Sequence, residues 1–136
     1  MEKYNNFING QWIDSEAKEI IKVEDPATAK VIGEIACAKN SEVDLAVSAA
    51  KESFNKRILV DMPLLQRAKL MHRIADETRK VAEEGGKLLC YENGKNLAAA
   101  IKEFNDVADM FDYYAGLTDK LEGKTIPVSH NVFDYT

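Results

Sequence analysis

Apolar residues near the end of the chain recur at alternating spacings of four and three positions. They are Leu97, Ile101, Phe104, Ala108, Phe111 and Ala115. Such spacing places them along one face of a helix and is typical of a seam that packs against another helix. We therefore expect a long helix from about Leu97 to Asp119, and its apolar face requires a partner.

Other helical patterns begin at Ser41, where Ser41 and Asp44 resemble a capping box. A second helix is predicted to start at Pro63, because the first turn of a helix does not use the backbone N–H that proline lacks. The Gly85-Gly86 pair is predicted to end that helix, and a short helical turn is predicted over 88–91 until Asn93-Gly94 breaks it. Helices are thus expected over about residues 41–119.

The first 40 residues instead show β-like patterns. Asn9-Gly10 is typical of a type I′ hairpin turn, in which both residues need positive φ. The Asp25–Thr28 segment predicts a second turn, in which Asp25 can bond to the backbone. We expect an antiparallel β-meander over about 7–37, then the helices, and finally an extended tail over 124–136. The fold class is α/β, or α+β within this one-domain stretch of 136 residues.

Composition and charge narrow the classes of function. The net charge of −5 disfavours nucleic acid as a partner, because phosphate contacts require a basic patch. No apolar run approaches the roughly 20 residues of a membrane span, so no membrane partner is expected. Residues 1–6 lack the layout of a signal peptide. A cytoplasmic location is the resulting expectation.

Motifs that carry catalysis are sparse. Cys37 and Cys90 show no Cys-x-x-Cys spacing, and both His72 and His130 are remote from them in sequence. Each thiol is therefore interpreted as a small hydrophobe rather than an activated nucleophile, and His72 as a surface residue. No Gly-x-Gly-x-x-Gly or Walker-type loop occurs. The chain alone is predicted to bind no cofactor.

Glu103 and Asp106 stand three residues apart on the predicted long helix, with Asp109 after another three. Side chains at this spacing share a helix face. Two carboxylates on one face could hold a cationic group. The alternative is a solvated acidic stripe opposite the apolar seam, and the spacing by itself does not choose between them.

Many short motifs occur in one order along the chain and together resemble a known family. They are Phe7-Ile8-Asn9-Gly10-Gln11-Trp12, Asp25-Pro26-Ala27-Thr28, Val31-Ile32-Gly33, Ser41-Glu42-Val43-Asp44, Ala49-Ala50 with Phe54, Arg67 with Leu70, Arg73-Ile74-Ala75, Asn93-Gly94-Lys95, Tyr113-Tyr114-Ala115-Gly116 and Gly123-Lys124-Thr125-Ile126-Pro127. This set is similar to the N-terminal portion of the NAD(P)-dependent aldehyde dehydrogenase superfamily. The resemblance covers nearly the whole chain.

The resemblance implies an oxidoreductase that oxidises aldehydes to carboxylates with NAD or NADP. It implies that this chain is the N-terminal portion of the cofactor-binding domain, without the complete Rossmann-like and catalytic domains. In the family, the nucleophilic cysteine, the general base and the cofactor loop all lie downstream of the position matching Thr136. No residue of this chain is therefore expected to be catalytic or to bind the cofactor, and the chain alone is predicted to be inactive.

The resemblance also suggests two sites. The backbone carbonyls of Val23 and Glu24, with the carboxylate of Glu92, match a monovalent cation site found in some members. Glu103 and Asp106 match positions at the substrate entrance that bind the amino end of aminoaldehydes. Glu103 alone also fits members that oxidise succinate semialdehyde, so the substrate stays open, as does the choice between NAD and NADP.

Two kinds of partner follow from these predictions. The apolar helix faces would be covered by the missing remainder of the enzyme, or by self-association. The alternative function, from a different class, is a self-standing helical module for interaction or oligomerisation.

Overall fold

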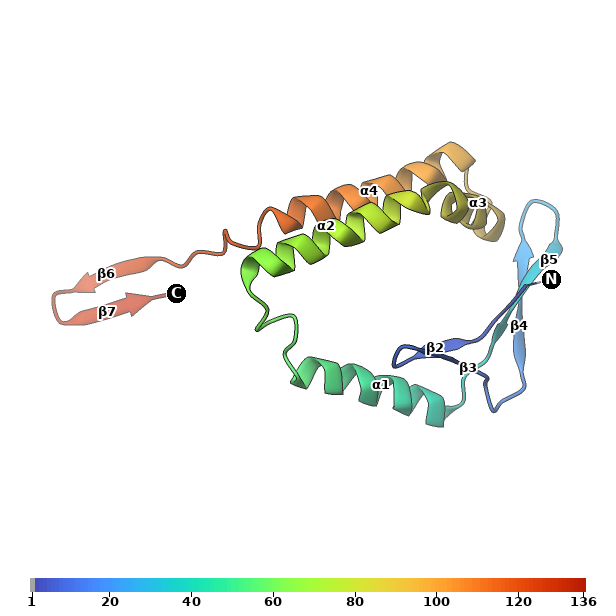
Figure 1. Ribbon diagram of the computed structural model, residues 1–136, viewed down its shortest axis with the longest axis horizontal. Helices are drawn as coiled ribbons and strands as arrows, with labels where there is room; N and C mark the ends of the chain where they lie inside the picture. Colours follow the sequence, from blue (N-terminus) through green and yellow to red (C-terminus); the bar gives the residue numbers. More distant parts are fainter. Residues whose placement is uncertain (1) are drawn as a thin grey trace.

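The computed structural model describes residues 2–136, with a β-rich end, a group of helices and a C-terminal hairpin (Figure 1). The elements are β1 (Glu2–Tyr4), β2 (Asn6–Ile8), β3 (Gln11–Ile13), β4 (Ile20–Asp25), β5 (Lys30–Ala36), α1 (Asn40–Asn55), α2 (Leu64–Lys80), α3 (Ala82–Asn93), α4 (Leu97–Ala115), β6 (Thr125–Ser129) and β7 (Val132–Tyr135). The predicted order of strands followed by helices is confirmed, and the fold is mixed α+β.

Both predicted turns form in the β-rich end. Asn9 and Gly10 have φ values of 51° and 80° between the antiparallel strands β2 and β3, as a type I′ turn requires. At the second turn the Ala27 N–H donates to Asp25 Oδ1 over 2.8 Å, and Thr28 Oγ1 donates to Asp25 Oδ2 over 2.7 Å. This turn joins β4 to β5, which pair antiparallel.

The strands of the β-rich end, β1 to β5, form two separate sheets rather than one continuous meander. β2 and β3 make a two-stranded sheet, and β1, β5 and β4 make a three-stranded sheet in that order. The antiparallel pairs β2–β3 and β4–β5 are present, but β3 and β4 belong to different sheets, which corrects the predicted meander over 7–37. Strand β1 was not predicted and pairs in parallel with β5. Its sequence, Glu2-Lys3-Tyr4, carries too few apolar residues to be read as a strand.

The start of α1 corrects the predicted capping box. The Lys39 N–H donates to Glu42 Oε2 over 2.7 Å, so Glu42 takes the role expected of Asp44. The same carboxylate accepts from Ser15 Oγ at 2.9 Å and from the Glu16 N–H at 3.1 Å. Glu42 is only 3% exposed. It therefore joins the loop after β3 to the start of α1, a contact between distant segments that local spacing does not reveal.

The prediction that Gly85-Gly86 ends a helix is wrong. The break falls at Val81, with φ −100° and ψ 5°, and α3 continues through both glycines to Asn93. A Cβ at Gly86 would lie 2.6 Å from Ile101 Cγ1 and 2.9 Å from Ile101 Cα on α4. These glycines allow two helices to approach closely. Gly94, at φ 74°, ends α3 as expected.

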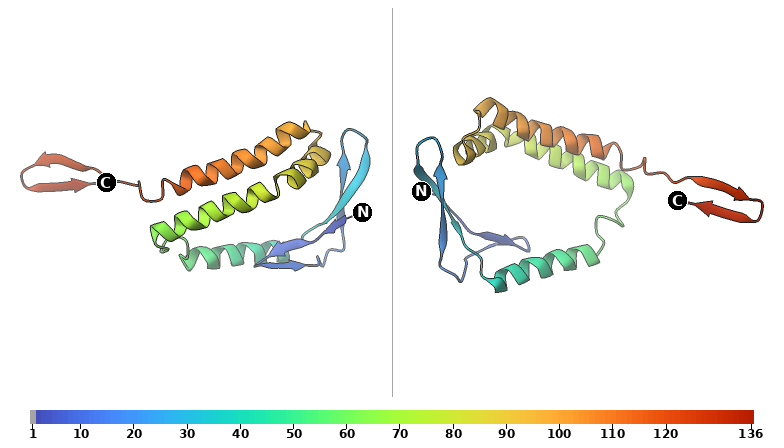
Figure 2. Two further views of the ribbon diagram at one scale, coloured as in Figure 1. Left: turned by 45° about the horizontal axis from the view of Figure 1, so that its top comes forward. Right: turned by 180° about the vertical axis from the view of Figure 1, so that it is seen from behind.

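Helices α2 and α3 cover the apolar seam of α4 (Figure 2). The buried apolar residues are all alanines: Ala75, Ala82, Ala100, Ala108 and Ala115. No large side chain within residues 3–136 is fully buried. Helix α1 lies apart from this group (Figure 1), and its Val43, Val47 and Phe54 are exposed. The core is therefore narrow, and much apolar surface faces outward.

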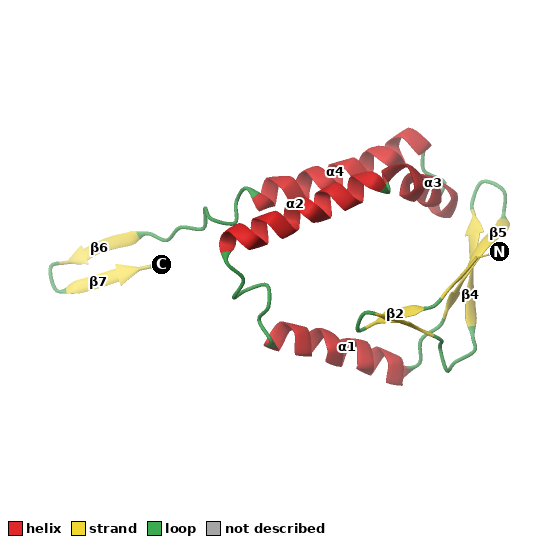
Figure 3. Ribbon diagram, viewed as in Figure 1, coloured by secondary structure: helices red, strands yellow, loops and turns green. Residues whose placement is uncertain are grey.

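The predicted extended tail is a β-hairpin of β6 and β7 that projects beyond the ends of α2 and α4 (Figure 3). It follows α4 after an irregular segment, 116–124. Helix α4 itself ends at Ala115, a few residues before the predicted end at Asp119. Within the described part of the chain, no helix is long and apolar enough to cross a membrane.

Candidate functional site

A groove lies along α4 where α2 packs against it. It is lined by Met71 from α2 and by Glu103, Asp106, Val107, Met110, Phe111 and Tyr114 from α4. These α4 positions recur every three or four residues and therefore share one side of the helix. Five of the seven lining side chains are apolar or aromatic. This apolar lining suits a small organic group, and the charged lining residues are Glu103 and Asp106.

Both predicted substrate-entrance residues therefore line one hollow, and each carboxylate has a cationic partner. Glu103 Oε1 lies 2.5 Å from Lys95 Nζ, and the two side chains are 50% and 34% exposed. Asp106 Oδ2 lies 2.6 Å from Lys102 Nζ, one helical turn away. The structure thus brings the predicted pair together. Binding of a substrate by these residues stays a prediction.

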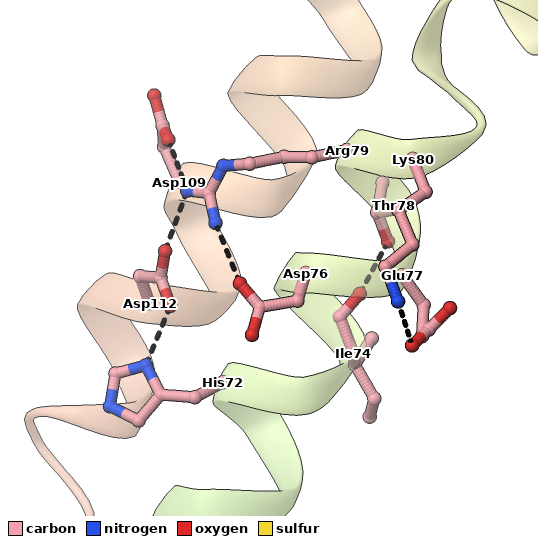
Figure 4. A network of polar contacts seen from close by, with 9 residues as sticks. All are labelled: His72, Ile74, Asp76, Glu77, Thr78, Arg79, Lys80, Asp109 and Asp112. Atoms are coloured by element: carbon pink, nitrogen blue, oxygen red, sulfur yellow. Dashed lines mark hydrogen bonds and ion pairs between the residues drawn. The ribbon is translucent and has the colours of Figure 1, made fainter.

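Helices α2 and α4 are also joined by a network of charged side chains (Figure 4). Asp112 accepts from His72 Nδ1 and from Arg79 Nη2, each over 2.6 Å, and Arg79 also bonds to Asp109 over 2.7 Å. Asp76 lies 3.8 Å from Arg79 Nη1. The bonds to His72 and Arg79 hold the pKa of the Asp112 carboxyl below its usual value. The bonds to Asp109 and Asp112 raise the pKa of Arg79.

Sequence reasoning missed this network. It interpreted His72 as a lone surface residue and grouped Asp109 with Glu103 and Asp106. In the structure His72 is 52% exposed but bonded to Asp112, and Asp109 pairs with Arg79. The available signal was the run of basic residues on α2 opposite the acidic residues on α4. These basic and acidic residues meet only because α2 and α4 pack antiparallel. Spacing within one helix does not specify that packing.

The predicted cation site lies at the opposite end of the molecule. Val23 of β4 and Glu92 of α3 line one hollow between the three-stranded sheet and α3, together with Tyr4, Ile35 and Tyr91. Glu24 follows Val23 on β4 but is not among the lining residues. Among the described residues no three His, Cys, Asp or Glu side chains gather as a metal site. Two of the three predicted ligands are the backbone carbonyls of Val23 and Glu24, and a cluster of side chains is not required for them. The cation site therefore stays a prediction.

The fit of a nicotinamide cofactor can be tested on the glycines and thiols. Gly85-Gly86, the only adjacent glycines in the sequence, lie inside α3 against α4 and not in a loop after a strand. Cys37 and Cys90 are free and partly buried, and neither is hydrogen-bonded to a histidine. The glycine pair therefore does not form the loop after a strand that dinucleotide sites use. That the chain alone binds no cofactor stays a prediction.

The strands and the packed helices define a mixed α+β scaffold with a groove along α4. The family model of the aldehyde dehydrogenase family matches residues 12–136. The chain therefore belongs to the aldehyde dehydrogenase family, as its motifs predicted.

Individual relatives agree with this assignment. The chain is 35% identical to the mitochondrial aldehyde dehydrogenase family 2 member B4 of Arabidopsis thaliana, over 91% of this chain and 23% of that protein. It is 32% identical to betaine aldehyde dehydrogenase of Bacillus subtilis (strain 168), over 88% of this chain and 24% of that protein. The NAD+ complex of aldehyde dehydrogenase from Bacillus cereus superposes with a TM-score of 0.85 at 30% identity, over 98% of this chain and 27% of that one. The chain thus spans about a quarter of these relatives' length.

Proposed function

We propose that this chain is the scaffold segment of an NAD(P)-dependent aldehyde dehydrogenase, which oxidises aldehydes to carboxylates. The observation that carries the proposal is the family match over 12–136. The groove between α2 and α4 supports it, because its apolar lining suits the organic group of an aldehyde. In this role α2 and α4 form one wall of the path by which the aldehyde enters.

We infer that the described residues do not assemble the groups that this chemistry requires. Aldehyde oxidation of this type needs an activated nucleophile, a base that activates water, and a nicotinamide that accepts the hydride. Among the described residues, no hydrogen bond joins Cys37 or Cys90 to a basic side chain, and the bond that His72 makes is to Asp112 and not to a thiol. We therefore infer that these 136 residues alone do not turn over aldehydes.

The test is a turnover assay on the purified chain. Aliphatic, aromatic and amino-substituted aldehydes are supplied with NAD or NADP, and formation of the reduced nicotinamide is followed. No formation above a protein-free blank is expected. The matched control is a Cys37→Ser/Cys90→Ser double variant. Turnover that scales with the chain and disappears in the double variant would overturn the inference of inactivity.

A second candidate function is association through apolar faces, with another copy or with the remainder of an aldehyde dehydrogenase. The supporting observation is the exposure of large apolar side chains on several elements, such as Phe54 at 78% and Trp12 at 66%. Surface of this kind favours association when it forms a contiguous patch. The stripe of Val43, Val47 and Phe54 on α1 is the part chosen for the test.

Size-exclusion chromatography with light scattering discriminates this candidate. We expect the mass of the native chain to rise with concentration and that of Val47→Asp to rise less, because a charge in the stripe opposes its burial. The control is Glu52→Asp, on the same helix, which keeps the charge. A monomer at every concentration would contradict association. It would leave the scaffold role standing.

A further inference from the structure

The loop between α3 and α4 holds Lys95 in a defined position. Gly94, at φ 74°, reverses the chain at the end of α3, and the Lys95 N–H donates to Asn93 Oδ1 over 2.9 Å. On the other side, Asn96 Oδ1 accepts from the Ala99 N–H over 3.2 Å and caps α4. The backbone of Lys95 is thus anchored before and after it. Its side chain starts from a fixed point beside the first two turns of α4.

From that point Lys95 reaches the end of the groove. Its Nζ lies 2.5 Å from Glu103 Oε1, across eight positions in the sequence. This pair links a loop to a helix, whereas Lys102 and Asp106 are an ordinary pair one turn apart on α4. Lys95 is also less exposed than Lys102, at 34% against 72%. Solvent therefore weakens the pair with Glu103 less than the other pair.

The charges that line the groove are consequently compensated. The ammonium of Lys95 compensates Glu103 and that of Lys102 compensates Asp106, while the remaining lining residues, such as Met110 and Phe111, carry no charge. A cationic ligand would have to displace a lysine that is already in place. An uncharged apolar group would only bury surface against the apolar side chains, which is favourable.

We propose that Lys95 sets the charge preference of this groove, so that it accepts an uncharged alkyl or aryl group in preference to a cationic one. This inference rests on the proposed role of the groove as a wall of the aldehyde path, and it names the substrate class. It selects against the aminoaldehyde alternative, which requires free carboxylates at Glu103 and Asp106. Lys95 acts through Glu103 and is therefore a specificity-determining residue and not a catalytic one.

The experiment compares two probes that differ in charge. Hexanol and hexylammonium share one alkyl chain and do not react with lysine as aldehydes do. Binding to the whole chain is followed by the backbone amide shifts of Val107 and Met110, which line the groove. We expect hexanol to bind the native chain more tightly than hexylammonium. In Lys95→Met, the affinity for hexylammonium should rise about threefold, as release of a partly exposed ion pair allows, while that for hexanol stays the same.

Three further variants isolate the cause. Lys102→Met removes the more exposed pair and should change the preference less than Lys95→Met does. Lys95→Arg keeps the charge and should keep the native preference. Glu103→Gln in the Lys95→Met background should abolish the gain for hexylammonium, because the released carboxylate is then gone. Circular dichroism confirms that each variant retains its helices.

The outcomes separate this inference from the proposed function. If neither probe shifts the groove amides, the groove is not a ligand site and the inference about Lys95 is overturned, while the scaffold role, which the family match over 12–136 carries, stands. If both probes bind but the native chain prefers hexylammonium, or Lys95→Met leaves the ratio unchanged, only the inference about Lys95 is overturned. The preference of the native chain is a test in itself and does not depend on any variant folding.

Discussion

Replacing Gly86 with alanine is expected to destabilise the chain, although glycine is a poor residue for the interior of a helix. The new Cβ would lie 2.6 Å from Ile101 Cγ1 and 2.9 Å from both the backbone N and Cα of Ile101. Favourable carbon contacts lie at roughly 3.5–4.0 Å. The Ile101 backbone belongs to α4 and cannot rotate away, so relief requires α3 and α4 to separate.

Two opposing effects set the size of the loss. In an unconstrained helix the change from glycine to alanine gains about 1 kcal/mol. Overpacking a closely packed site costs about 1–3 kcal/mol, and the upper part of that range applies because the obstacle is backbone. The free energy of unfolding should therefore fall by about 1–2 kcal/mol. Gly85→Ala should cost less, because the three atoms nearest its Cβ all belong to the ring of Phe104, a side chain that can turn.

Urea unfolding followed by circular dichroism measures these changes. The control is Gly116→Ala at the end of α4, where φ is −66° and the nearest atom, Tyr113 O, is 3.4 Å from the new Cβ. Without strain there, alanine should be neutral or stabilise by about 0.4–1 kcal/mol through the unfolded state. If Gly86→Ala is as stable as the native chain or more so, the close approach of α3 to α4 does not explain this glycine.

Three more predictions concern the polar contacts and the turns. Stability should fall in acid: the folded pKa of Asp112 lies below its usual 3.8, because His72 and Arg79 bond to its charged form, so its contribution is present above that pH and is lost as the pH falls through the folded pKa. The urea midpoint should therefore fall less from neutral to acidic pH in Asp112→Asn than in the native chain. An equal fall in the variant and the native chain would contradict this. Glu42→Gln should speed amide hydrogen exchange at Glu16 and Lys39, whose N–H groups donate to this carboxylate. The control variant Glu52→Gln should leave exchange at both amides unchanged. If Glu42→Gln also leaves it unchanged, Glu42 does not hold these segments together. Gly94→Ala should destabilise by about 1–2 kcal/mol, because φ is 74° and the Cβ would lie 3.0 Å from Pro26 Cγ. The control is Gly10→Ala, at φ 80° with nothing within 4 Å of the new Cβ, which should show the backbone strain alone. If both variants lose the same free energy of unfolding in urea, the contact with Pro26 adds nothing.

Short-range patterns predicted the local structure of this chain well. The Asn9-Gly10 and Asp25–Thr28 turns formed as expected because their chemistry is contained within a few residues. The seam of α4 was correctly read as a helix face, and its partners turned out to be α2 and α3. The glycine pair at 85–86 was misread because the same residues that end helices also permit close helix packing. Local sequence does not distinguish those two uses.

The candidate site was predictable only in part. Spacing alone put Glu103 and Asp106 on one face, and both line the groove. Their lysine partners were not predicted, although Lys102 stands one turn from Asp106. Lys95 reaches Glu103 only because Gly94 reverses the chain and Asn96 starts α4 beside it. The network of His72, Arg79 and Asp112 likewise exists only where two antiparallel helices meet.

The amino-acid sequence by itself therefore determined the family, the order of strands and helices, and the faces that pack, because each of these depends on neighbours a few residues apart. The tertiary structure decided which distant segments meet: Glu42 with the loop at Ser15, Gly86 with Ile101, and Lys95 with Glu103. Those contacts place a lysine beside a carboxylate of the groove and set the fit of the helices. They depend on the direction in which each helix leaves its loop, and no periodicity within a single helix encodes that direction.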